Sequence, residues 1–304
     1  MALDNVLLIW NGKGGVGKSS LTANFCGLLA SSGWNVLDVD LDKQGHQAID
    51  LGVIKQSDRG ENLLAAIRGE APLAPIRAVR KHDNDGTLDL VPGGKHLRQL
   101  PQIIRDAVSE QGIHGHAVLE DLFEAVASEY DLVVVDMPPG DIEIERAAAY
   151  MGRWALIPTL PDLGSVQGLV NVWDSVEDIL EVNQRLYVLG VALMLVNPTA
   201  KTVPRELRQQ LGRLLGDHVP VFESTVRLTQ VAALDCRARG LLAHEYEIAA
   251  TEAMPWYEAR KTGKPTKRFS SAAAALAQDY QQLTDEILEL IIKDLTSDKE
   301  EAND

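Results

Sequence analysis

Short apolar runs alternate with helical periodicities along this chain, and their order predicts the class of fold. Apolar runs bounded by turn residues predict strands at residues 5–10, 34–40, 88–92, 132–136, 154–158 and 188–196. Apolar residues spaced three and four apart predict helices at residues 21–31, 61–69, 73–80, 97–109, 117–128, 165–182, 204–215 and 270–295. Because strands that alternate with helices form parallel sheets covered on both faces, we expect an α/β fold with a single doubly wound, mostly parallel sheet flanked by helices.

Composition indicates one large domain. The chain has 304 residues, 45% of them hydrophobic, and no linker rich in Pro, Gly or Ser divides it. We expect a domain over residues 1–295 and an acidic, disordered tail over residues 296–304. The N-terminus lacks a signal-peptide pattern, and no apolar segment approaches the roughly 18 residues of a membrane span. Cys26 and Cys236 have no partner at metal-binding spacing, which fits a reduced cytoplasm.

The strongest chemical signal directly follows the first predicted strand. Gly12, Gly17, Lys18 and Ser19 satisfy the phosphate-loop pattern G-x-x-x-x-G-K-[ST], with a predicted helix behind them. In such a loop the backbone N–H groups point at phosphate oxygens, the lysine reaches the β- and γ-phosphates, and the hydroxyl holds Mg²⁺. The predicted nucleotide-binding residues are Gly12, Lys13, Gly14, Gly15, Val16, Gly17, Lys18, Ser19 and Ser20.

Acidic residues stand at the ends of two other predicted strands, where ligands of open α/β sheets bind. Asp40 and Asp42 are two residues apart and share one face of an extended chain, so one can position water while the other serves Mg²⁺. Asp136 ends an apolar run, as a Mg²⁺-holding acid does in nucleoside triphosphatases, and the following Pro-Pro-Gly suits a switch segment. Loop acids that cap a turn are the plain alternative for Asp40 and Asp42, and a turn that ends the strand is the alternative for Asp136.

Asn197 follows the predicted strand at residues 188–196. An asparagine at a strand end can hydrogen-bond an adenine edge, or it can begin a turn. Both interpretations stay open. The chain has no N-K-x-D motif nearby, so the usual recognition of guanine is not predicted.

Taken together, these motifs resemble the ParA/MinD family of deviant Walker-A ATPases, a group of P-loop NTPases, and in particular its ParA partition branch. The matching stretches are Lys13-Gly-Gly-Val-Gly-Lys18-Ser19, Val36-Leu-Asp-Val-Asp40-Leu-Asp42-Lys-Gln44-Gly45, Asp131-Leu-Val-Val-Val-Asp136-Met-Pro-Pro139 and Asn197. Three positions depart from the family pattern: Asp38 in a normally aliphatic strand, Lys43 in place of proline, and Ser224-Thr225 in place of Pro-Arg.

The resemblance implies a function and a role for each motif residue. Lys13 is the signature lysine that reaches the nucleotide of the partner subunit, Asp42 activates water, and Ser19, Asp136 and Asp40 serve the metal region. ATP and Mg²⁺ are the implied cofactors. The implied activity is slow ATP hydrolysis by a homodimer that forms with ATP, binds double-stranded DNA without sequence preference, and is stimulated by a ParB-like centromere-binding protein. The implied place is the cytoplasm, on the nucleoid, during plasmid or chromosome segregation.

A DNA-binding surface has to be weighed against a formal net charge of -15. Local basic residues nevertheless offer a candidate patch, partly on one helix face and partly in a cluster near residue 264. The candidate residues are Lys201, Arg205, Arg208, Arg227, Lys261, Lys264, Lys267 and Arg268. An ordinary solvated basic face is the alternative for each of them.

Other functions compete with DNA partition. The same ATPase switch could position a protein cargo, such as a chemoreceptor array, a carboxysome, a pilus or the division machinery. A MinD-like membrane protein would need a basic amphipathic C-terminal helix, whereas the predicted final helix is acidic. We therefore predict no membrane partner, and the absence of paired cysteines counts against a redox relative.

Overall fold

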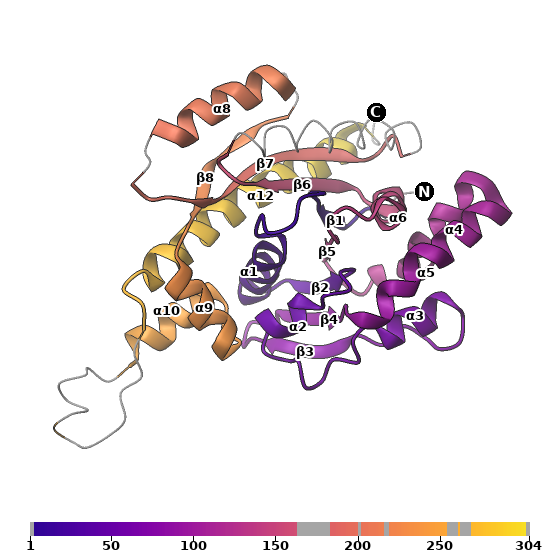
Figure 1. The fold of residues 1–304 in the computed structure, drawn as a ribbon, viewed down its shortest axis with the longest axis horizontal. Helices are drawn as coiled ribbons and strands as arrows, with labels where there is room; N and C mark the ends of the chain where they lie inside the picture. Colours follow the sequence, from indigo (N-terminus) through magenta and orange to yellow (C-terminus); the bar gives the residue numbers. More distant parts are fainter. Residues whose placement is uncertain are drawn as a thin grey trace.

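The structure, a computed structural model, describes residues 3–162, 183–199, 202–215, 219–253, 261 and 269–301. Its centre is an eight-stranded sheet with the order β3-β4-β2-β5-β1-β6-β7-β8 (Figure 1). All neighbouring strands are parallel except β3 and β4. The strands are β1 (Val6–Ile9), β2 (Asn35–Asp40), β3 (Ile76–Lys81), β4 (Thr87–Val91), β5 (Leu132–Asp136), β6 (Trp154–Thr159), β7 (Tyr187–Val196) and β8 (Val221–Arg227). The predicted class, a mostly parallel doubly wound sheet, is confirmed.

Helices cover both faces of the sheet and divide the core in two. One apolar cluster lies under α3 (Glu61–Ile67), α4 (Leu100–Gln111), α5 (Val118–Ala127), α6 (Ile142–Met151) and α8 (Thr202–Leu215). The other lies under α1 (Lys18–Ser31), α2 (His46–Asp50), α9 (Gln230–Arg239), α10 (Ala243–Thr251) and α12 (Ala273–Glu301). Two short 3₁₀ turns, η1 (Lys95–Gln99) and η2 (Gly112–Ala117), flank α4. The central strands are apolar on both faces because both faces are buried.

One predicted helix is wrong. Residues 73–80 place Leu73, Ile76 and Val79 three apart, which is typical of a helix, but the segment forms the edge strand β3. It pairs antiparallel with β4, and the Ala78 amide donates to Asp89 Oδ1 over 2.6 Å. The free edge of β4 offers backbone hydrogen bonds to residues 76–81, and the spacing of apolar residues along the chain does not reveal this partner.

The predicted helix at residues 165–182 lies outside the described residues. Helix α12 continues to Glu301, which is inside the stretch expected to be a disordered tail, and the boundary at residue 295 stays a prediction. Within the described part of the chain, no helix is long and apolar enough to cross a membrane.

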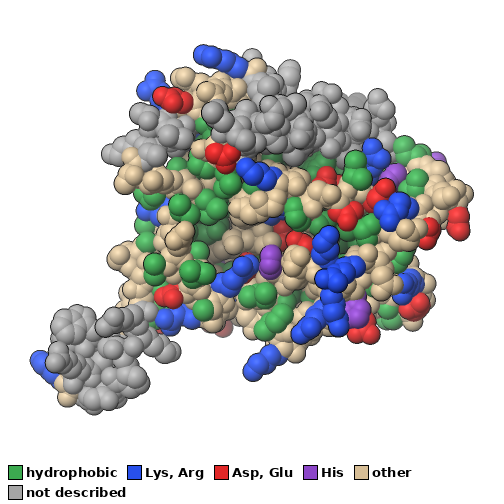
Figure 2. All heavy atoms as spheres, viewed as in Figure 1, with side chains coloured by type: hydrophobic (Ala, Val, Ile, Leu, Met, Phe, Trp, Pro, Cys, Tyr) green, Lys and Arg blue, Asp and Glu red, His purple; other side chains and the backbone are tan. Residues whose placement is uncertain are grey.

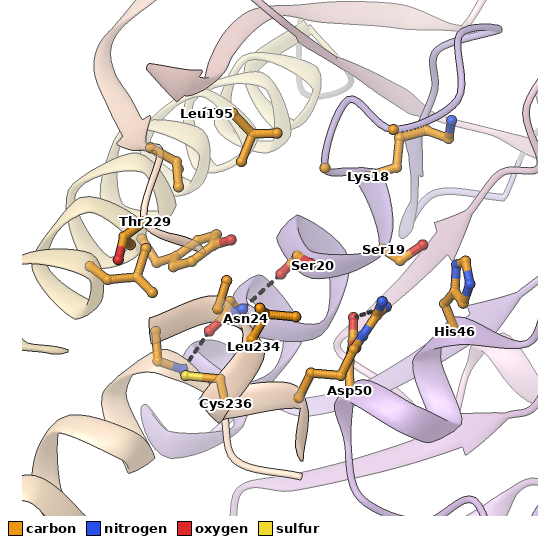
Figure 3. A pocket seen from close by; sticks show the side chains of 18 of the residues that line it. Lys18, Ser19, Ser20, Asn24, His46, Asp50, Leu195, Thr229, Leu234 and Cys236 are labelled. Carbon is orange, nitrogen blue, oxygen red and sulfur yellow. Dashed lines mark hydrogen bonds and ion pairs between the residues drawn. The ribbon is translucent and has the colours of Figure 1, made fainter. Parts of the chain in front are cut away.

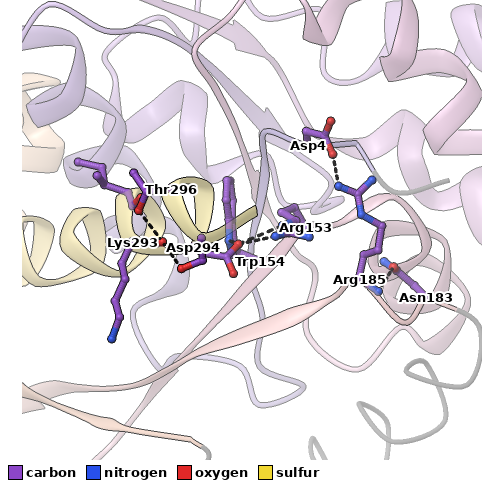
Figure 4. A network of polar contacts seen from close by, with 10 residues as sticks. Asp4, Arg153, Trp154, Asn183, Arg185, Lys293, Asp294 and Thr296 are labelled. Carbon is purple, nitrogen blue, oxygen red and sulfur yellow. Dashed lines mark hydrogen bonds and ion pairs between the residues drawn. The ribbon is translucent and has the colours of Figure 1, made fainter. Parts of the chain in front are cut away.

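Helix α12 is held to the sheet by a buried polar cluster (Figure 4). Asp294 Oδ2 accepts from Arg153 Nη2 over 2.6 Å and from Trp154 Nε1 over 2.9 Å. The Arg153 side chain is only 9% exposed, and this carboxylate offsets part of the cost of burying its charge. The start of β6 and the end of α12 are thereby joined across 140 positions of sequence.

We predict that Asp294→Ala lowers the free energy of unfolding by about 2 kcal/mol, because it removes the carboxylate to which the Arg153 guanidinium and the Trp154 indole N–H donate. Urea unfolding of the nucleotide-free protein measures this as a lower midpoint at an unchanged slope. Glu289→Ala, on an exposed position of the same helix, is the control and should change stability by no more than about 0.5 kcal/mol. Equal losses in the two variants would show that the cluster is not what holds the helix.

Candidate nucleotide-binding site

The loop between β1 and α1 has the backbone of a phosphate-binding loop. Gly15 and Gly17 have φ angles of 76° and 90°, in the left-handed region that glycine adopts without strain. Asn11 anchors the loop: its Nδ2 donates to the Pro158 carbonyl over 2.8 Å, and its Oδ1 accepts the Lys13 amide over 2.8 Å. The loop therefore curls around its own interior and delivers Lys18 at the first position of α1.

Lys18 lies across the interior of the loop. Its Nζ donates to the carbonyl of Asn11 over 2.8 Å and to that of Lys13 over 3.1 Å. Burial lowers the pKa of Lys18, while the charges of Asp136, Asp42 and Glu145 act in the opposite direction. The ammonium group is thus held by two carbonyls of the loop backbone.

Three neighbouring strands bring the acidic motifs to this loop. In the parallel pairing of β1, β5 and β2, Asp136 is in register with Ile9 on one side and with Asp40 on the other. The carboxyl ends of these strands consequently meet at one edge of the sheet. This arrangement brings the loop, Asp136 and the Asp40–Asp42 segment together as the sequence predicts.

Gln47 belongs to the site although the sequence did not indicate it. The side chain is fully buried, and its Nε2 donates to Asp136 Oδ2 and to the Ser19 carbonyl, each over 3.1 Å. Its partners lie 89 and 28 positions away in the sequence, so no local pattern could have identified it. Gln47 therefore fixes the orientation of Asp136 relative to the start of α1.

Asp40, the last residue of β2, and Asp42 beyond it have different surroundings. Both Asp40 oxygens accept backbone N–H groups, from Asp42 over 2.9 Å and from Gln47 over 3.1 Å. Asp40 thus shapes the loop from within, and it is not among the described residues that line the cavity. Asp42 does line the cavity, and its Oδ1 accepts the Gln44 amide over 2.9 Å.

The residues around Asp136 fit a hard divalent cation. Among the described residues, Asp136 Oδ1 and Gln47 Oε1 are buried without a hydrogen-bond partner, and the hydroxyl of Ser19 is close enough to Asp136 to lower its pKa. Burial outweighs this effect and raises the pKa of Asp136 from 3.8 to about 6. Carboxylate, amide and hydroxyl oxygens are what Mg²⁺ selects, so Ser19 and Asp136 could hold it, directly or through water.

Asp38 adds a further carboxyl group below the site. It is completely buried in β2, and neither of its oxygens has a hydrogen-bond partner within the described structure. Burial, together with the charges of Asp136 and Asp40, raises the pKa of Asp38 well above its usual range. The position that departs from the family pattern is therefore occupied by an acid whose surroundings favour its neutral form.

A cavity of about 800 Å³ extends from the phosphate loop toward α9 (Figure 3). Its polar end is lined by Gly14, Gly15, Gly17, Lys18, Ser19, Ser20 and Asp42. Its other end is lined mainly by apolar side chains, among them Leu195, Leu228, Leu234, Leu276 and Tyr280. A strained backbone at Leu195, with φ at 54°, interrupts the regular pairing of β7 beside this cavity. A phosphate end joined to an apolar end has the shape and chemistry that a nucleotide requires.

The wall of the cavity is tied to the Asp40–Gln47 segment. Arg237 on α9 forms an ion pair with Asp50 at the end of α2, and its second contact, from Nη2, measures 3.2 Å. Figure 3 shows Asp50 at the rim of the cavity, below His46. Helix α2 thus contacts Asp136 through Gln47 and the cavity wall at Arg237 through Asp50.

Two predicted nucleotide contacts are directed elsewhere. The Lys13 ammonium lies 3.5 Å from Asp162 Oδ1, and both side chains are partly exposed. Asn197 is exposed, and its Oδ1 accepts the amide of Thr199 over 3.0 Å, which is the turn-forming alternative. Neither Lys13 nor Asn197 is among the described residues that line the cavity.

The predicted DNA-binding residues are only partly visible. Lys201, Lys264, Lys267 and Arg268 lie outside the described residues. Arg205 and Lys261 are exposed. Arg208 donates to the carbonyls of Phe222 and Glu223, and Arg227 forms a two-point ion pair with Asp279 over 2.6 and 2.7 Å. The two arginines thus direct their donors into the protein, and the DNA assignment stays a prediction.

Comparison with known proteins identifies similar sequences over most of the chain. A family model described as an AAA domain matches residues 4–188. The chromosome partitioning protein ParA of Caulobacter vibrioides is 27% identical over 258 residues, which covers 82% of this chain and 90% of that protein. The cell division protein PomZ of Myxococcus xanthus is 28% identical over 215 residues, covering 71% of this chain and 63% of PomZ.

Solved structures share the fold at lower identity. An ATP complex of a Cyanothece McdA variant has a TM-score of 0.67 and 17% identity, covering 95% of this chain and 98% of that one. The cell division ATPase MinD of Pyrococcus furiosus has a TM-score of 0.64 and 20% identity, covering 95% and 100%.

We predict that Gln47→Met raises the Mg²⁺ concentration needed for half-maximal nucleotide binding by about tenfold or more, because outer-shell partners of metal ligands have effects of that size. The measurement is a Mg²⁺ titration with a fluorescent ATP analogue. Gln56→Met, at an exposed position, is the matched control. A purely structural role for Gln47 would instead weaken nucleotide binding equally with Mg²⁺ and with EDTA.

The raised pKa of Asp136 leads to a prediction about stability. Above pH 6 the folded protein holds a buried carboxylate whose charge opposes folding, and this cost disappears as the pH falls through about 6 toward 4. Asp136→Asn keeps an acceptor for Gln47 and removes the charge. Without nucleotide it should be about 2–3 kcal/mol more stable than the wild type at pH 7.5, and about equal to it near pH 4. Urea unfolding at a series of pH values checks this, and a variant less stable at pH 7.5 would contradict it.

Proposed function

This chain belongs to the AAA-domain family whose model it matches, in the ParA/MinD branch, and from that premise we propose that it is an ATP-dependent switch that partitions DNA. With ATP it dimerises and binds double-stranded DNA without sequence preference on the nucleoid. Hydrolysis, stimulated by a ParB-like partner, then releases it. The observation that carries the proposal is the cavity in which the phosphate loop, Asp42 and the Asp136 region meet at one edge of the sheet.

The chemistry follows from the positions of these side chains. Lys18 binds the β- and γ-phosphates, and Asp42, at the polar end of the cavity, orients the attacking water. Ser19 and Asp136 hold Mg²⁺, with Gln47 keeping Asp136 in place. When bound, the ion neutralises charge that develops on the phosphate oxygens. The apolar end of the cavity takes the base and excludes water from it.

In this proposal, Lys13 is the residue that makes hydrolysis depend on the dimer. In the single chain its ammonium group lies beside Asp162. This partly exposed pair is weak, so it can be exchanged at small cost for a phosphate of the nucleotide in a second subunit. A cation that reaches the phosphates from the partner acts as an arginine finger does, so hydrolysis requires the dimer.

The relatives support DNA as the cargo and also support one alternative cargo. A chromosome partitioning protein matches 82% of the chain, which favours DNA. The similarity to the cell division protein PomZ and to the MinD structure supports a second candidate, an ATPase that positions a protein assembly. Binding to DNA distinguishes the two.

We predict that the protein binds a random-sequence duplex with ATP and Mg²⁺, and not with ADP or without nucleotide. Affinity should fall with salt, with a log–log slope of about −0.9 for each phosphate neutralised. Asp42→Ala should hydrolyse no ATP, because it lacks the group that orients water, and should therefore stay on DNA after ATP is mixed in. Fluorescence anisotropy of the duplex and phosphate release in the same sample measure both effects.

Lys18→Ala is the negative control, since it should lose the nucleotide-dependent response altogether. Nucleotide-dependent dimerisation without DNA binding would favour the protein-cargo alternative. Normal hydrolysis by Asp42→Ala would contradict the role assigned to Asp42.

A further inference from the structure

Four exposed basic residues outside the predicted DNA surface come together at the carboxyl edge of β2 and β4. They are Lys43, Arg59, Lys95 and Arg98, and we refer to them as the loop-edge patch. Within the described part of the chain, none of these side chains has an ion pair or a hydrogen bond. Their charges therefore face solvent without compensation.

The loops that carry the patch pack directly against one another. A Cβ on Gly45 would meet the Gly93 carbonyl at 3.0 Å, and one on Gly94 would meet the backbone of Arg59 at 2.8 Å. The His96 amide donates to the Arg59 carbonyl over 3.2 Å. Lys43 and Arg98 line the same small cavity of about 80 Å³. Figure 2 shows Lys and Arg side chains gathered on this face, between the positions of α2 and α3 in Figure 1.

Acids that lie beside the patch in the sequence or at its cavity form no ion pair with it within the described structure. Asp58 accepts the amides of Gly60 over 2.9 Å and Asn62 over 2.8 Å, and Asp42 accepts the amide of Gln44. Asp141 borders the cavity beside Lys43 and Arg98 without forming an ion pair with either. A solvated cluster of one sign acts over about 10 Å at moderate salt, so in a chain of net charge -15 this patch is a local site for an anion.

Two of the predicted DNA-binding arginines provide the contrast. Arg227 is committed to Asp279, and Arg208 to two backbone carbonyls. A cation that is already paired gives up that interaction before it binds phosphate, whereas the loop-edge patch has nothing to give up. Phosphate contacts from flexible lysines and arginines fix position without reading bases.

We propose that the loop-edge patch contacts the phosphate backbone of double-stranded DNA. The inference rests on the proposed function and names the surface through which DNA is held. It also connects DNA binding to the nucleotide: Lys43 stands between Asp42 and Gln44, which both line the nucleotide cavity. A nucleotide that orders this loop thereby orders a DNA contact.

The test replaces three patch residues and spares Lys43, which adjoins Asp42. The variant Arg59→Gln/Lys95→Gln/Arg98→Gln is compared with Lys81→Gln/Arg213→Gln/Lys293→Gln, which removes the same charge from exposed positions elsewhere. Binding to a random-sequence duplex with ATP and Mg²⁺ is measured over a salt series, and DNA-free ATP hydrolysis checks that each variant is folded. In the patch variant we expect affinity at low salt to fall about tenfold or more, and the log–log salt slope to become shallower by about 2.7. The control variant should change little.

The outcomes separate this inference from the function on which it rests. If the wild type does not bind DNA with ATP, both fail. If the wild type binds and the patch variant keeps its affinity and salt slope, the patch is overturned while the function stands. Equal losses in the two variants also overturn it, because net charge rather than location would then explain the effect.

Discussion

The register of three parallel strands is the constraint on which this site depends. Ile9, Asp136 and Asp40 lie side by side across β1, β5 and β2. The loop that follows β1 and the acids at the ends of the other two strands therefore meet at one place. A shift of one residue in either pairing would turn Asp136 to the other face of the sheet, away from Ser19. Continuous apolar packing on both faces of the central strands holds that register.

The same register also brings several carboxyl groups of like charge close together. Asp38, Asp40 and Asp136 are almost completely buried within a few residues of one another, and burial raises the pKa of each. The structure compensates in two ways. Asp40 is satisfied by two backbone amides, and Lys18 places its ammonium group beside Asp136 and Asp42. A bound cation would neutralise the remaining excess of negative charge. The carboxyl groups that repel one another in the free protein are therefore the groups expected to bind the cation.

Helix α2 connects this charged region to the rest of the fold. Gln47 near its start holds Asp136, and Asp50 at its end pairs with Arg237 of α9. Just beyond it, Arg80 donates to the carbonyls of Leu51 and Gly240 and forms an ion pair with Glu245. The segment after Asp42 is thereby fastened both to Asp136 and to the wall of the cavity. Helix α2 in this way joins the polar end of the cavity to its wall at α9.

The sequence by itself determined whatever depends on neighbours in the chain. Residues 12–19 define the phosphate loop because glycine at φ above zero and a helix immediately behind it are local requirements. The apolar runs and their order determined the sheet class, because a strand that is buried on both faces consists of consecutive apolar residues. Only the tertiary structure decided what distant segments do to one another. It made residues 76–81 a strand through pairing with β4, brought Gln47 to Asp136, and paired Arg227 with Asp279. Hydrogen bonds and ion pairs of this kind join positions 52 or 89 apart, and no periodicity along the chain records such a distance.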